Sequence, residues 1–161
     1  MCISTGTITE PFPDRPTEGQ IVFSVTIPTA VKSALFDDKS QGRERERESE
    51  LCRLLERSLR DSEAVDTESL CIVAGQLAWE LSCDIKVLDD CGNAFDAVSL
   101  AAAASLRAFR RPEVTISREA APEGSPPGTI FRTAIIVHPE DEREPLPLAL
   151  HHTPVSVTVT Y

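Results

Sequence analysis

The residues with the most chemical potential are the histidine pair His151 and His152 and the carboxylates Asp84, Asp89 and Asp90. Two imidazoles can share a metal ion, and two carboxylates can act as general acid and base. The histidines, however, are adjacent at the start of a predicted strand, where neighbouring side chains point to opposite faces. Asp89 and Asp90 fall in a predicted turn, where aspartate is common. We therefore predict structural roles for these residues and no metal or catalytic site.

The cysteines offer little more. They are odd in number, and no Cys-x-x-Cys pair occurs among Cys2, Cys52, Cys71, Cys83 and Cys91. This usage predicts reduced thiols of an intracellular protein, without zinc. Cys91 has no histidine near it in sequence that could activate it as a nucleophile. The chain also lacks a glycine-rich phosphate loop, so no cofactor is predicted.

Three arginines, Arg43, Arg45 and Arg47, alternate with glutamates inside the charged segment 37–50. Arginine is well suited to contact the phosphates of RNA, which makes these residues candidates for RNA binding. Each arginine is flanked by glutamate, so the segment carries little net charge. A solvated connector is the competing interpretation and the one that this charge balance favours.

Composition limits the possible partners. The 161 residues include 16 Lys and Arg against 26 Asp and Glu, a formal net charge of −10, and 41% are hydrophobic. These values predict one soluble, acidic domain with a buried core. They argue against a free-standing nucleic-acid binder, which needs a basic surface. No secretory signal is visible, and the longest nearly apolar run, 97–106, is too short to cross a bilayer.

Hydrophobic periodicity predicts an α+β fold in which two helices cover one face of a mixed, largely antiparallel sheet. The first two strands are expected to be a hairpin or a neighbouring pair, and Gly75-Gln76 is expected to join a tight hairpin. A Pro/Gly-rich loop insertion is predicted over 118–129. The predicted strands are 3–9, 20–27, 70–74, 77–87, 113–117, 131–137 and 155–161, and the predicted helices are 51–62 and 95–110.

Several sequence blocks resemble the RNase PH superfamily. They are RLLERSLRD (53–61), DTESLCIVAG (66–75), FRRP (109–112), EREPLPL (142–148) and HHTP (151–154). More narrowly, they resemble the catalytically silent ring subunits of the eukaryotic RNA exosome, of the smaller polymyositis/scleroderma autoantigen type. The resemblance implies an RNase PH-like (ribosomal protein S5 domain 2-like) fold.

One departure from the family bears on catalysis. Active members are phosphorolytic exoribonucleases with an Asp-Gly-Gly-Thr-Arg-like turn, whose arginine helps to hold the attacking phosphate. Here the turn is Cys91-Gly92-Asn93-Ala94-Phe95, without the arginine. Because phosphoryl transfer depends on cationic neutralisation of the phosphates, we expect no catalytic residues. The resemblance then implies a structural exosome subunit that supports 3′-to-5′ RNA processing and degradation. The alternatives are a phosphate-dependent 3′-to-5′ exoribonuclease and a non-functional fragment.

The resemblance also implies partners and location. These are the other RNase PH-like ring subunits, RNA-binding cap subunits and RNA within the assembled ring, without a membrane, in nucleus, nucleolus and cytoplasm. Compared with the family, residues 1–161 are expected to form a partial domain, truncated at both ends. The strands that lead into the family domain and the half that carries its catalytic aspartates would be missing.

Overall fold

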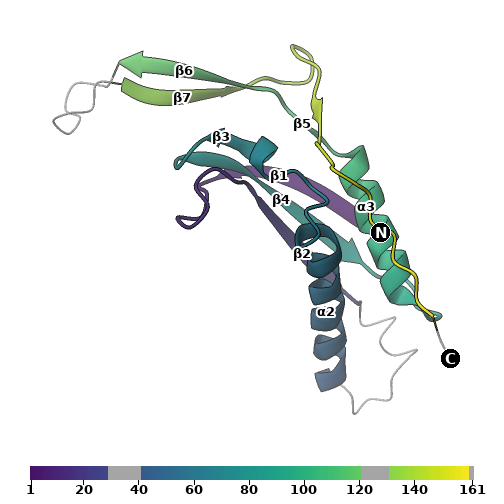
Figure 1. The fold of residues 1–161 in the computed structure, drawn as a ribbon. Helices are drawn as coiled ribbons and strands as arrows, with labels where there is room; N and C mark the ends of the chain where they lie inside the picture. Colours follow the sequence, from purple (N-terminus) through teal and green to yellow (C-terminus); the bar gives the residue numbers. More distant parts are fainter. Residues whose placement is uncertain (29–40, 121–130, 160–161) are drawn as a thin grey trace. The chain divides into compact units, whose positions relative to one another are not determined.

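The computed structural model describes residues 1–28, 41–120 and 131–159, and for 41–44, 118–120 and 131–133 it describes only the backbone (Figure 1). The chain divides into two compact units rather than one. The first comprises Met1–Phe109 and Leu148–Tyr161, and the second comprises Arg110–Pro147. The first unit holds the main sheet and both long helices. No helix of the described residues is long and apolar enough to cross a membrane.

The sheet of the first unit is built around one central strand. Its strands are β1 (Cys2–Thr9), β2 (Gln20–Thr26), β3 (Cys71–Val73) and β4 (Leu77–Lys86). β1 and β3 pair with β4 in antiparallel orientation, whereas β2 pairs with it in parallel. The expected β1–β2 pair is therefore wrong, because β4 lies between them. The expected tight hairpin between β3 and β4 is confirmed, and Gly75 in its turn has a φ of +73°.

Alternation along β4 gives this central strand one apolar and one polar face. Leu81 and Cys83 are fully buried and face the core, whereas Asp84 and Lys86 are exposed on the opposite face. Across the ladders, Phe23 of β2 lies opposite Cys83, so apolar side chains of both strands share the core face. β4 is the longest strand with this alternation, so it contributes the longest apolar face to the core.

Helix α2 (Gln41–Leu55) continues directly into a π-helical turn over Glu56–Arg60. Its leucine face is buried as the sequence predicted, with Leu55 and Leu59 almost inaccessible. The helix begins at Gln41, however, so the described part of the charged segment 37–50 is helical rather than a connector. Glutamate and arginine are good helix formers even without an apolar stripe. The expectation failed because it required leucines to mark the helix.

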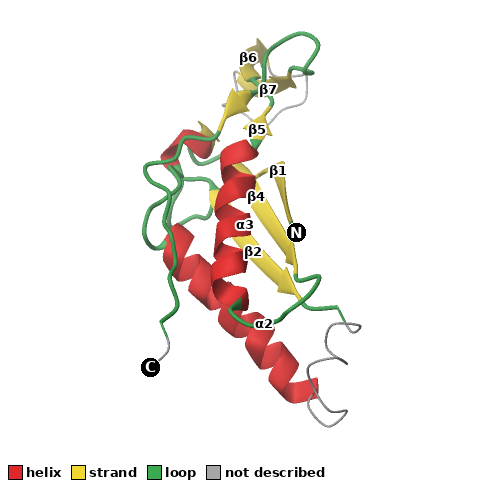
Figure 2. Ribbon diagram, turned by 90° about the vertical axis from the view of Figure 1, so that its right-hand side faces the viewer, coloured by secondary structure: helices red, strands yellow, loops and turns green. Residues whose placement is uncertain are grey.

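Helix α3 (Ala94–Ala108) packs on the same face of the sheet as α2. α2 contacts β2, and α3 contacts β1 and β4 (Figure 2). The alanine run brings α3 close to the strands, and the Ser105 and Ser4 hydroxyls lie 2.7 Å apart. This arrangement confirms the predicted α+β class. The predicted helix end was two residues too late, because Phe109 is extended and the following arginines form β5 (Arg110–Arg111).

The predicted strand 155–161 is wrong over its described part, since residues 155–159 form no strand. The segment is held instead by the carboxylate of Asp96, which accepts hydrogen bonds from Thr158 N (2.9 Å) and Thr158 Oγ1 (3.1 Å). The pKa of Asp96 is lowered most by the hydrogen bond from the Asn93 side chain, and these bonds from Thr158 lower it further. Val155 and Val157 are more than 70% exposed. The alternation is that of a strand, but no strand among the described residues pairs with it.

The second unit consists of two antiparallel pairs. β6 (Val114–Ala120) pairs with β7 (Phe131–Val137), and β5 pairs with β8 (Leu146–Pro147). The Thr115 hydroxyl and His138 Nε2 lie 2.7 Å apart across the first pair. β6 extends three residues beyond its predicted end, so residues 118–120 of the expected Pro/Gly-rich insertion 118–129 are strand. Residues 121–129 of that insertion lie outside the described part of the chain.

Candidate nucleic-acid interface

The arginines that the sequence proposed for RNA binding have different environments. Arg45 is exposed on α2, whereas Arg47 is partly buried and its guanidinium pairs with Asp90. The side chain of Arg43 lies outside the described structure. RNA contact by any of the three stays a prediction. Their geometry, however, makes Arg45 accessible to a phosphate and gives Arg47 a structural partner.

The Arg47–Asp90 pair joins α2 to the turn that follows β4. Arg47 Nη2 donates to Asp90 Oδ2 at 2.6 Å, and the Asp90 side chain is only 3% exposed. The other carboxylate oxygen, Oδ1, accepts the backbone N–H of Gly92 at 2.9 Å. On the next residue of α2, Glu48 Oε1 accepts the backbone N–H of Ile27 at 2.8 Å. Two neighbouring residues of the charged segment therefore anchor α2 to the segments that follow β2 and β4, at the same end of these parallel strands.

Sequence reasoning missed two accessible cations farther along the same helical segment. Arg53 and Arg57 are exposed and form no ion pair within the described part of the chain. They are one helical turn apart, and Arg45 lies about two turns before Arg53, so the three follow one side of the segment. Arg60 differs, because it lies 3.6 Å from Glu56 and 3.7 Å from Asp61. The sequence signal that could have identified Arg53 and Arg57 is their helical spacing on the polar face opposite the leucines.

The turn between β4 and α3 corresponds to the segment where an arginine-containing turn is expected in catalytically active RNase PH-like proteins. Gly92 has a φ of +111° and Asn93 a φ of +55°, so both adopt left-handed conformations. The Asn93 amide donates to Asp96 Oδ2 at 2.8 Å. Residues 88–96 contain three aspartates and no basic residue. The turn thus offers carboxylates where a bound phosphate would need cations.

The remaining chemically capable residues are dispersed. His151 and His152 are both exposed, and no group of three or more His, Cys, Asp or Glu side chains within residues 1–28, 41–120 and 131–159 could hold a metal ion. All five cysteines are free. Burial raises the pKa of the Cys83 thiol to about 11, so it stays protonated at neutral pH. None of these residues assembles into a nucleophilic or metal site.

Comparison with known protein families identifies the family to which this fold belongs. Residues 1–112 match RNase PH, the 3′ exoribonuclease family, domain 1. The chain belongs to this family. The RNase PH match ends at Pro112, so it includes the main sheet, both long helices and the arginine-free turn.

Among its relatives, the RNase PH chain is 40% identical over 159 residues to exosome complex component RRP45A of Arabidopsis thaliana, covering 98% of this chain and 47% of the relative. It is 36% identical over 161 residues to exosome complex component rrp45 of Schizosaccharomyces pombe, covering 100% and 49%. Identity to the Homo sapiens RRP45 component is 34% over 148 residues, covering 92% and 30%. The chain thus spans about half or less of the length of these relatives.

Two solved structures share the fold. An archaeal exosome core matches with a TM-score of 0.55 and 35% identity, covering 68% of this chain and 38% of that one. The Archaeoglobus fulgidus exosome with RNA bound to the active site matches with a TM-score of 0.59 and 27% identity, covering 82% and 55%. These neighbours support the RNase PH-like fold that the sequence blocks predicted.

Proposed function

We propose that this chain is a non-catalytic structural subunit of an RNA exosome ring, supporting 3′-to-5′ RNA processing and degradation, including rRNA maturation and RNA turnover. The observation that carries the proposal is the run of relatives named exosome complex components in a plant, a fission yeast and a mammal, which align with 92% or more of this chain. Because the chain spans about half or less of those relatives, its activity and partners are part of the proposal.

The turn of residues 88–96 supports the non-catalytic part. Phosphorolysis requires cations that hold the attacking phosphate and the developing charge. The turn presents Asp89, Asp90 and Asp96 and no arginine. Arg47 comes close, but its guanidinium donates to Asp90. A cation that binds the attacking phosphate would therefore have to come from outside this turn.

The charge distribution supports a shared contact with RNA. A net charge of −10 opposes independent RNA binding. Arg45, Arg53 and Arg57 nevertheless present cations along one side of α2 and its π-helical extension. In the proposed ring these arginines face RNA beside other RNase PH-like subunits and RNA-binding cap subunits, without a cofactor or a membrane. The proposed locations are the nucleus, nucleolus and cytoplasm, where rRNA is matured and RNA is turned over.

Co-expression tests the proposed assembly. The tagged 161-residue chain is expressed with the other ring subunits of its own organism, and the complex is isolated by affinity and size-exclusion chromatography. We expect the ring subunits to co-elute with the chain in equal amounts. A chain that aggregates and captures none of them would support the non-functional-fragment alternative.

A phosphorolysis assay tests the absence of activity. The chain, alone and in the isolated complex, is incubated with an oligoribonucleotide and inorganic phosphate, and nucleoside diphosphates are measured. We expect no phosphate-dependent release from the chain alone. Any release in the complex should be unchanged when Asp89, which is exposed in this turn, is replaced by asparagine. Release by the chain alone would establish the exoribonuclease alternative.

A further inference from the structure

A groove in the first unit has none of the arginines that are proposed to face RNA (Arg45, Arg53 and Arg57) in its lining. It encloses about 880 Å³ between the loop after β1, the start of β2 and the segment that follows the π-helical turn, with His151 at its border. This volume falls within the range of about 300–1,000 Å³ that is typical of ligand-binding clefts. The groove is formed entirely within one compact unit.

Part of the groove is apolar and open to solvent. Phe12, in the loop after β1, is 60% exposed, and Val22 of β2 is 44% exposed. The residue between Gln20 and Val22, Ile21, is instead buried in the core at 4% exposure. An aromatic ring and a β-branched side chain therefore line a concave surface without covering each other from water. Exposed apolar side chains in a concavity are characteristic of binding sites.

Charged side chains complete the lining and give it a clear sign. The carboxylates are Glu18, Asp61, Glu63, Asp66 and Glu68, and the cations are Arg15 and Arg60. With histidine neutral, the lining has a formal charge of −3.

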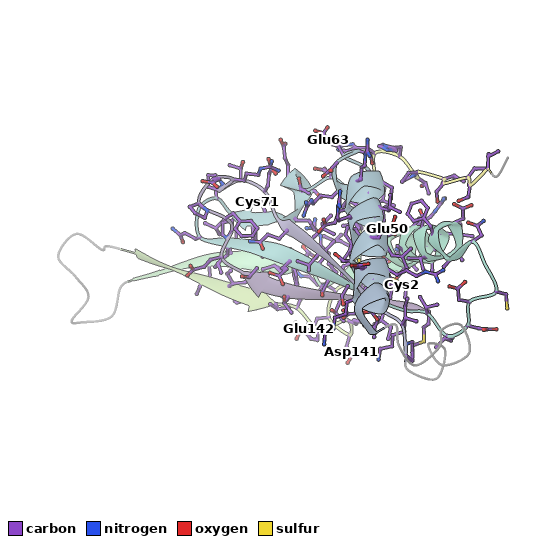
Figure 3. All side chains as sticks on the ribbon, turned by 90° about the horizontal axis from the view of Figure 1, so that it is seen from below. Cys2, Glu50, Glu63, Cys71, Asp141 and Glu142 are labelled. Carbon is purple, nitrogen blue, oxygen red and sulfur yellow. The ribbon has the colours of Figure 1, made fainter. Side chains whose placement is uncertain are left out.

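The two arginines already lie beside carboxylates of the groove. Arg15 lies 3.4 Å from Glu18, and Arg60 lies 3.7 Å from Asp61. Glu63 and Glu68 form no ion pair within the described part of the chain. Figure 3 shows Glu63 beyond the end of the helical segment, apart from Glu50 on α2. Two carboxylates are thus available to an incoming cation.

We propose that this groove docks a protein segment carrying lysine or arginine next to an aliphatic residue. The cationic head would pair with Glu63 and Glu68, while the Phe12 ring offers a cation–π face and Val22 receives the aliphatic part. A phosphate-bearing ligand such as RNA is disfavoured, because the carboxylates outnumber the arginines and repel it. The proposal goes beyond the ring-subunit function and does not depend on it.

A labelled peptide tests the proposal with the full chain. Binding of fluorescein-Gly-Arg-Leu-Arg-Leu-Arg-Gly is followed by anisotropy, and Glu63→Gln/Glu68→Gln is compared with the matched pair Glu46→Gln/Glu50→Gln on α2. The groove pair should weaken binding about tenfold, as expected for two partly exposed ion pairs. The control pair should change it less than about twofold, because it lowers the overall negative charge equally but lies outside the groove. Circular dichroism checks that the variants are folded.

A second variant separates docking from general attraction to an acidic protein. Phe12→Ala should weaken the peptide about threefold to tenfold through loss of cation–π and apolar contact, with the charge unchanged. Equal weakening by both glutamate pairs, no effect of Phe12→Ala, or no saturable binding would each overturn the proposal. So would a ten-nucleotide RNA that displaces the peptide. Failure of the exosome pull-down, by contrast, leaves the peptide result unaffected.

Discussion

At the scale of single residues, Arg47 shows how a buried partner decides what a cation does. A carboxylate as buried as Asp90 is unstable without a compensating charge, because removal from water penalises its ionised form. Arg47 supplies that charge at 2.6 Å, and Gly92 N supplies a further donor. Arg45, two residues earlier, is exposed. This difference could not be predicted from the sequence, because Arg45 and Arg47 both alternate with glutamate in the same way.

Replacing Arg47 with alanine should destabilise the first unit. The change leaves Asp90 buried without its cation, and breaking a fully buried pair costs about 3–5 kcal/mol. The Arg47 side chain is 34% exposed, so we expect a smaller loss, about 2 kcal/mol in the free energy of unfolding. Urea denaturation followed by circular dichroism measures the loss.

Two further variants identify the cause. Arg45→Ala, at an exposed position of the same helix, should change the unfolding free energy by no more than about 0.5 kcal/mol. The double variant Arg47→Ala/Asp90→Asn should recover at least about 1 kcal/mol, because it removes the unpaired charge. If the two substitutions were simply additive, the ion pair would not be the source of the effect.

Cys83 predicts a pH dependence in alkaline solution. Burial, partly offset by the hydrogen bond with Ser4, raises the pKa of its thiol from 9.0 to about 11. The folded state therefore keeps the proton at pH values where the unfolded chain releases it. This contribution to stability is fully present below pH 9 and is lost as the pH rises towards 11. The loss should be about 2–3 kcal/mol.

The measurement compares urea denaturation at pH 8, 9, 10 and 11 for the native chain and Cys83→Ala. Alanine lowers the stability at every pH because it leaves a cavity, but it has no thiol to ionise. The difference in unfolding free energy between the two proteins should therefore narrow above pH 9. A constant difference from pH 8 to 11 would show that Cys83 does not ionise on unfolding in this range.

At the scale of elements, the sheet depends on close approach of the segments that lead into it. Gly19, just before β2, donates its backbone N–H to the carbonyl of Thr67 at 2.9 Å. A Cβ at this position would lie 2.4 Å from Leu70 Cβ and 2.6 Å from the Trp79 carbonyl oxygen. Both are too short for non-bonded atoms, and neither atom belongs to the free end of a flexible side chain.

Gly19→Ala should therefore cost about 2–3 kcal/mol, the upper range for overpacking, because β2 must move away from β4. Gly6→Ala is the matched comparison, since its added Cβ would lie 3.0 Å from the tip of the Phe109 ring and at an ordinary contact distance of 3.5 Å from the Trp79 ring. It should cost less than Gly19→Ala. Thermal unfolding of both variants checks the order, and equal melting temperatures would contradict it.

The elements that sequence predicted correctly are those whose own residues contain the decisive information. The alternation of β4 and the leucine face of α2 are local patterns, and both are confirmed. The pairing of β1 with β4, whose paired residues are 69 to 83 positions apart in sequence, is not encoded locally. The helical start of α2 has no apolar stripe, and residues 155–159 have a strand pattern without a partner strand in the described structure. The candidate site could not be predicted fully for the same reason, because no local pattern in the sequence indicates that Asp90 pairs with Arg47.

At the scale of the whole molecule, a net charge of −10 must be reconciled with a proposed contact to RNA. The chain places five carboxylates around its groove and three aspartates in the turn before α3. Exposed arginines that form no ion pair within the described residues, by contrast, follow α2 and its π-helical extension. A chain with an overall negative charge can repel RNA as a free monomer and still contribute a few phosphate contacts through these arginines once neighbouring subunits hold the strand.

The accessible arginines of α2 and its extension predict how RNA affinity should depend on salt in the assembled ring. Replacing Arg45, Arg53 and Arg57 with glutamine removes up to three phosphate contacts. Because single strands release about 0.7 counterion for each contact, the slope of log K against log salt should fall by about 1–2. Arg143→Gln, whose guanidinium lies 2.8 Å from Glu113 in the second unit, is the control and should leave the slope unchanged. Fluorescence anisotropy of a labelled oligoribonucleotide between 50 and 300 mM salt measures both. An unchanged slope in the triple variant would place the RNA path on another face of the chain, because lost phosphate contacts cannot leave counterion release unaltered.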